Sequence, residues 1–145
     1  MNRPILFLMV LLWLGCKPEP REIDYGLDAC SYCKMNIVDA KYAAELVTKK
    51  GKIYTYDAIE CLVNDLEAHP EDGVAHRLIK DFSAPDQWVE ATTAVFVIHP
   101  KVQSPMGGNL AGFSVATNAQ KALSIPADSL LTWEEIKSQN FVFEQ

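Results

Sequence analysis

The chain has 145 residues and a formal net charge of −6 at pH 7. Once a leader is removed, this length corresponds to one domain with a modest hydrophobic core. The acidic balance excludes nucleic acid as a partner, because a polyanion would be repelled.

The first residues predict export and a lipid anchor. Arg3 precedes an uncharged apolar run over residues 5–14, which is too short for the roughly 20 residues of a membrane-spanning helix. The run ends in Leu-Trp-Leu-Gly-Cys, which resembles the lipobox of bacterial lipoproteins. We therefore interpret residues 1–15 as a lipoprotein signal peptide and Cys16 as the acylated first residue of the mature chain. The alternative is a plain signal peptide with an incidental cysteine.

This interpretation places the protein in the cell envelope, anchored to the inner or the outer membrane and facing the periplasm. Residues 16–27 carry prolines and charges and little to bury, which is typical of a tether. Residues 28–145 are the predicted domain, with possible halves at 28–90 and 91–145.

The first half predicts a hairpin followed by a helix. Strand-like runs at 44–48 and 52–56 surround Lys49-Lys50-Gly51, a turn signal. Asp57 stands three residues before Glu60, which is the spacing of a capping box, and apolar residues then recur at helical spacing. A helix is expected from residue 58 to about residue 68.

Four further strands and two short helices are expected downstream. The helix at 119–123 would be capped by Thr117 and Asn118, and the helix at 133–138 by Thr132 and Glu135. The predicted fold class is α+β: two small ββαβ-like units, with antiparallel sheets and helices packed on one side. The expected strands are 76–82, 88–90, 94–98 and 111–115.

The cysteine count argues against a simple disulfide scaffold. If Cys16 is acylated, Cys30, Cys33 and Cys61 remain, and an odd number leaves at least one thiol free. Cys61 lies on the apolar face of the expected helix, where a buried inert thiol is expected, with a metal ligand as the alternative.

The segment Cys30-Ser31-Tyr32-Cys33-Lys34-Met35 allows four interpretations. A c-type haem site needs histidine after the second cysteine, where Lys34 stands. A thioredoxin-like redox pair lacks the usual βαβ context, and structural zinc lacks a second ligand pair. The fourth is copper(I), which thiolate and thioether sulfur together select.

Copper(I) also accounts for the methionines. On an extended segment Cys33 and Met35 point the same way and can face one ion. Met106, in a glycine-containing loop, is the expected ligand from the second half, although it could instead fill a gap over an apolar neighbour. Cys30 is either a fourth ligand or the disulfide partner of Cys33 in the metal-free protein. His99 is expected to be a surface histidine, with nitrogen ligation as the alternative.

Three segments, CSYCKM, YTYDAIECL and PMGGNLAGF, resemble those of the NosL family in order and separation. Lys34 and Glu60 stand where the family pattern has glycine. The resemblance implies two related ββαβ units, similar to organomercurial lyases without their activity. It also implies a monomeric periplasmic copper(I) chaperone that delivers copper to the maturation machinery of nitrous oxide reductase, an ABC transporter with a periplasmic partner.

No carboxylate pair or nucleophile–base arrangement in the sequence supports catalysis, so an enzyme is not expected. The alternative function is an exported thiol-disulfide oxidoreductase that uses Cys30 and Cys33.

Overall fold

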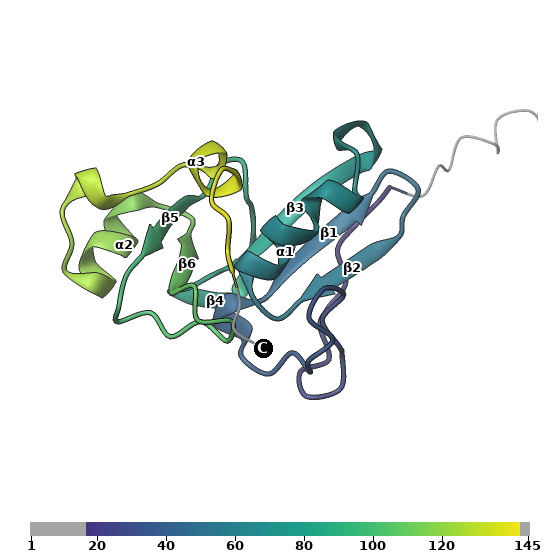
Figure 1. The fold of residues 1–145 in the computed structure, drawn as a ribbon, viewed down its shortest axis with the longest axis horizontal. Coiled ribbons are helices and arrows are strands. Elements are labelled where there is room, and N and C mark those ends of the chain that lie inside the picture. The colour runs from purple at the N-terminus through teal and green to yellow at the C-terminus, as the bar shows by residue number, and fades with distance from the viewer. Residues whose placement is uncertain (1–16, 143–145) are drawn as a thin grey trace, which may run out of the picture.

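The computed structural model describes residues 17–142, which form two antiparallel sheets with helices packed against them (Figure 1). The predicted signal peptide and Cys16 lie outside the described residues. Within residues 17–142, no helix has the length and apolar character needed to cross a membrane. The α+β class predicted from the sequence is confirmed.

The larger sheet belongs to the first half of the chain. Its strand order is β2-β1-β3-β4, with all neighbours antiparallel. The predicted hairpin is present, and Gly51 in its turn has a φ of +81°, a conformation that favours glycine. The four strands are β1 (Ala44–Thr48), β2 (Ile53–Tyr56), β3 (Val74–Asp81) and β4 (Ala84–Glu90).

Helix α1 (Ile59–Asp65) follows β2 and continues as a 3₁₀ turn at Leu66–Ala68, which together match the expected helix. The predicted cap is wrong: Ala58 is the N-cap residue, with no side-chain hydrogen bond. The Asp57 carboxylate is instead buried without a hydrogen-bond partner. Burial, and to a lesser extent the nearby Cys30, raises the pKa of Asp57 to about 6.

The second half repeats this order on a smaller scale. Strands β5 (Val95–Ile98) and β6 (Leu110–Phe113) pair, helix α2 (Ala116–Leu123) follows, and Leu131 then bridges Phe96 of β5. In α2 the predicted cap is wrong, because the helix begins at Ala116 after Val115 and has no side-chain cap. In α3 (Trp133–Lys137) the predicted capping box of Thr132 and Glu135 is present.

The two sheets meet closely at Gly112 of β6. A Cβ atom built there would lie 2.1 Å from Ile79 Cδ1 on β3, so a glycine is needed for this approach. Next to this point, the Ser114 backbone N–H donates to the Asp81 carboxylate at 2.8 Å. The halves are therefore packed as one body around a shared core.

The later part of the predicted tether is packed on the domain. Ile23 is buried in the main core, and the Arg21 backbone N–H donates to Glu45 Oε2 on β1 at 3.2 Å. Only residues 17–20 precede these contacts among the described residues.

Candidate metal centre

Three cysteine thiols converge between the N-terminal loop and helix α1. The Sγ atoms of Cys30, Cys33 and Cys61 all lie within 4.8 Å of one another, and none of the three is in a disulfide. Two of these thiols come from the Cys-x-x-Cys segment and the third from the first turn of α1. Sulfur atoms at this separation can share one metal ion.

The loop that carries Cys30 and Cys33 is a tight turn fixed to strand β2. Ala29 and Asn36 form an antiparallel bridge, and inside it the Cys30 N–H donates to the Met35 carbonyl at 2.8 Å. The Ser31 N–H donates to the Thr55 carbonyl on β2 at 2.7 Å. Because α1 begins directly after β2, this contact brings the loop to the start of the helix that holds Cys61.

Lys34 adopts a left-handed conformation, with a φ of 67°. This conformation is unfavourable for residues with a Cβ atom and is easily adopted by glycine. The backbone conformation at this position therefore explains why the family pattern has glycine here. In this chain Lys34 adopts the same left-handed conformation, although its side chain makes that conformation less favourable. The Lys34 N–H closes the turn by donating to the Cys30 carbonyl at 3.1 Å.

The three thiols differ in acidity. A hydrogen bond from the Cys61 thiol, aided by backbone N–H groups of Asp57, Cys33 and Tyr32, lowers the pKa of Cys30 to about 5 despite its burial. The same hydrogen bond, together with burial, raises the pKa of Cys61. Burial raises the pKa of Cys33 as well. Of the three thiols, Cys30 is therefore the one whose thiolate form is favoured.

Access to the cluster is from one side. Cys30 is 1% exposed and Cys61 is fully buried, whereas Cys33 is only half-buried. An ion held by the three sulfur atoms would reach solvent or a partner past Cys33.

The two predicted methionine ligands lie on different segments of the chain. Met35 is in the same turn as the cysteines and its side chain is 49% exposed. Met106 is half-buried and packs against the same core cluster as Cys33. His99 is held locally, its Nδ1 accepting the Lys101 N–H at 3.1 Å, and is not one of the grouped ligand residues.

Glu60 ties the Met106 loop to α1. The Ser104 hydroxyl, in that loop, donates to the buried Glu60 carboxylate and also accepts the Asn109 N–H at 2.9 Å. A Cβ atom at Gly108 would lie 2.6 Å from Glu60 Oε1, so the loop passes close to this side chain. The glutamate that replaces the family glycine thus fills a space between the Cys61 helix and the Met106 loop.

We expect Ser104→Ala to destabilise the protein by about 1–3 kcal/mol, because it removes a donor from a buried carboxylate whose pKa burial already raises. Urea denaturation measures the effect. Ser83→Ala is the control. Ser83 is exposed, and its hydrogen bond to Asp81 is donated by the backbone N–H, so the substitution leaves that bond intact. Equal stability of the two variants would show that the Glu60 contact does not hold the loop.

Cys61 is the residue that sequence reasoning wrongly placed outside the cluster, with a metal-ligand role only as the alternative. Its burial is as predicted, but it is not isolated, because its thiol lies next to those of Cys30 and Cys33. The odd count of free cysteines was the available signal, since three unpaired thiols in an exported chain need a common reason.

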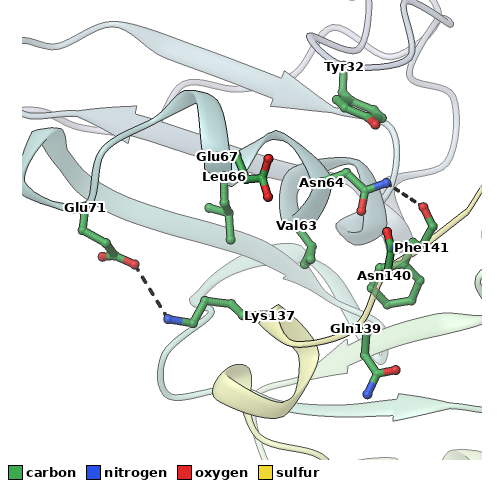
Figure 2. A pocket seen from close by; sticks show the side chains of 10 residues that line it. All are labelled: Tyr32, Val63, Asn64, Leu66, Glu67, Glu71, Lys137, Gln139, Asn140 and Phe141. Atoms are coloured by element: carbon green, nitrogen blue, oxygen red, sulfur yellow. Dashed lines mark hydrogen bonds and ion pairs between the residues drawn. The ribbon is translucent and has the colours of Figure 1, made fainter.

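A cavity of about 480 Å³ lies between α1 and the C-terminal segment, and Tyr32 of the Cys30–Cys33 turn borders it (Figure 2). Asn64 Nδ2 donates to the Phe141 carbonyl across it at 2.8 Å, and Lys137 lies 3.7 Å from Glu71. None of the three cysteines lines this cavity, although Tyr32 stands between two of them in the sequence.

Comparison with known proteins gives a consistent result. The family model described as NosL matches residues 22–141. The crystal structure of the copper chaperone NosL from Shewanella denitrificans has a similar fold, with a TM-score of 0.66 and 20% sequence identity, covering 83% of this chain and 96% of that one. A search of curated proteins gave no significant match.

Proposed function

Because the chain belongs to the NosL family, we propose that it is a copper(I) chaperone that carries its cargo at the thiol cluster. The observation that carries this proposal is the convergence of the Cys30, Cys33 and Cys61 sulfur atoms within 4.8 Å. The solved NosL structure with a similar fold is described as a copper chaperone, which supports the same cargo.

The donor set favours copper(I) over other ions. Thiolate sulfur is soft and polarisable and suits copper(I), zinc and iron–sulfur clusters. A structural zinc site takes four nitrogen or sulfur ligands, and the group found among the described residues offers three cysteines with no histidine or carboxylate. A soft monovalent ion needs fewer ligands and fits this group better.

In the proposed site, Cys33 is the accessible sulfur that anchors copper, losing its proton as the ion binds, and Cys30 and Cys61 are the buried sulfur ligands beside it. Met35 and Met106 supply thioether sulfur on the accessible side. Met35 is exposed two residues from the half-buried Cys33, and Met106 is half-buried against the large hydrophobic core on which Cys33 also packs. These two methionines would hold the ion as it enters or leaves.

Met35→Leu and Met106→Leu keep size and apolar character, so we expect each to weaken copper(I) binding by about tenfold while the fold is retained. Competition against a copper(I) chelator measures the affinity. If only Met106→Leu lowered the affinity, Met106 would be the one thioether ligand of copper(I). Parent-like affinity in both variants would remove the methionines from the site.

Delivery to another protein is supported by the surface around the site. Five of the eight large hydrophobic residues exposed in the described chain lie between residues 25 and 38. Such a grouping of exposed apolar side chains marks an interaction surface. They are Tyr25, Leu27, Tyr32, Met35 and Val38.

The proposed recipient is the maturation machinery of nitrous oxide reductase, an ABC transporter with a periplasmic partner, as the family resemblance implies. The proposed chaperone is a monomer held to a membrane through lipid on Cys16 and facing the periplasm. Transfer would proceed by ligand exchange at the docked surface, where a sulfur ligand of the partner replaces those on the Cys33 side.

The thiol-disulfide oxidoreductase remains as the alternative function, favoured by the lowered pKa of Cys30. Against it, a nucleophilic thiol must be reached by a substrate disulfide, and Cys30 is 1% exposed. Titration of the reduced protein with copper(I) against a chelator separates the two functions. Tight binding of one ion supports the chaperone, and dithiol redox activity without copper binding supports the oxidoreductase.

A further inference from the structure

The turn between β1 and β2 carries a group of lysines in an otherwise acidic protein. Lys49, Lys50 and Lys52 are exposed and border a depression of about 450 Å³. The remaining residues of its lining are Thr48, Tyr54, Asp72 and Gly73.

The positive charge of this lysine group is not neutralised by the protein. Among residues 17–142, none of the three lysines takes part in an ion pair. Lys52 Nζ lies 4.5 Å from the centroid of the Tyr54 ring, and Asp72 is the single carboxylate of the lining. Nearby Glu71 is already paired with Arg77 and Lys137. An uncompensated cationic group in an acidic protein indicates an anionic ligand.

The described chain also starts at this end of the molecule. The Arg21 N–H bonds Glu45, which pairs with Thr55 at the far end of the hairpin, and Figure 1 shows residues 17–20 leading away from there to the turn end of the β1–β2 hairpin. Lys17, the first described residue, directly follows Cys16. A lipid on Cys16 would therefore place the membrane beside the lysine group.

The thiol cluster lies toward the opposite end of the hairpin. The loop of Cys30 and Cys33 is bonded to Thr55, near the end of β2, whereas the lysines precede the start of that strand at Ile53. At a rise of about 3.3 Å per residue, the strand separates the two features by about 10 Å or more.

We propose that Lys49, Lys50 and Lys52 bind the anionic phospholipid headgroups of the membrane that holds the anchor. This contact turns the domain so that the thiol cluster faces away from the bilayer, toward a partner. The inference rests on the lipid attachment in the proposed function, but not on copper. Each lysine close to an anionic surface strengthens binding about fivefold, so two or three suffice to orient a domain that is already tethered.

The test uses the mature acylated chain, purified from membranes and reconstituted in vesicles, with limited trypsin digestion as the readout. On phosphatidylglycerol-containing vesicles we expect cleavage after Lys49 and Lys50 to slow by about tenfold relative to pure phosphatidylcholine vesicles. Cleavage after Lys101 and Lys121, both exposed in the second half, is the internal control and should not change. High salt should abolish the protection.

A matched pair of variants identifies the residues. In the double variant Lys49→Gln/Lys50→Gln, anionic vesicles should no longer slow trypsin cleavage after Lys52. In the double variant Lys101→Gln/Lys121→Gln, cleavage after Lys49, Lys50 and Lys52 should still be slowed. Protection that is absent in the parent, equal at all sites, or equal in both variants would overturn the inference. The inference would also be overturned if inorganic phosphate removed the protection and chloride at the same ionic strength did not, because this would indicate a site for free phosphate.

If the parent chain were recovered in the soluble fraction without lipid, both this inference and the proposed lipid anchor on Cys16 would be overturned. Copper(I) titration of that same material would still report on the chaperone function, so the two failures are distinguishable.

Discussion

Cys33→Ser should lower the affinity for copper(I) at least about 100-fold, the largest effect expected of any single substitution. Even changes to groups that only support a metal ligand cost about 10–100-fold, and a hydroxyl is a poor donor to a soft ion. Cys33 is also the half-buried member of the cluster, where the cargo enters. Chelator competition under reducing conditions measures the change.

Ser31→Ala is the control for Cys33→Ser. Ser31 lies in the same turn, but its hydrogen bond to Thr55 is made by the backbone and survives the substitution. The control should bind copper(I) as the parent does. If Cys33→Ser also kept parent-like affinity, the thiol cluster would not be the copper site.

Cys61→Ala should lower copper(I) affinity by at least about tenfold, although Cys61 stands in a helix, outside the Cys-x-x-Cys segment. The substitution removes one of three converging sulfur atoms and leaves a small apolar side chain in a fully buried position. The same variant should bring the pKa of Cys30 back up, because the hydrogen bond from Cys61 is the main cause of its depression. Alkylation rates across a pH series, measured in mild denaturant, report that pKa.

Two readouts separate a ligand role for Cys61 from a packing role. A packing role alone predicts a loss of stability in urea with unchanged copper(I) affinity. A ligand role predicts lost affinity in protein that remains folded. Unchanged affinity in folded Cys61→Ala would restore the inert thiol expected from the sequence.

The local signals in the sequence predicted much of the fold. The hairpin around Gly51 and the capping box of Thr132 and Glu135 are present because turn residues and short-range hydrogen bonds act over a few positions. The caps predicted at Asp57 and at Thr117 and Asn118 are absent, because cap spacing alone does not decide whether a side chain turns back to its helix or faces the core. Core packing decided the first, because the Asp57 carboxylate is buried, whereas α2 begins at Ala116, so that Thr117 and Asn118 lie inside the helix.

The candidate site was predictable in part. The Cys-x-x-Cys segment and its sulfur chemistry are visible in the sequence, and the structure places Cys30 and Cys33 together. The contribution of Cys61 depends on the Ser31–Thr55 hydrogen bond, which brings the loop to the start of α1. No local pattern reports a contact of this kind. The ligand roles of Met35 and Met106 remain predictions.

The most direct test of the chaperone account is copper K-edge X-ray absorption of the reduced, copper-loaded protein. We expect a copper(I) edge and a first shell of sulfur alone, with the sulfur count falling in Cys33→Ser and in Cys61→Ala. A first shell of nitrogen or oxygen, or a sulfur shell unchanged in both variants, would contradict a cuprous site at the three thiols.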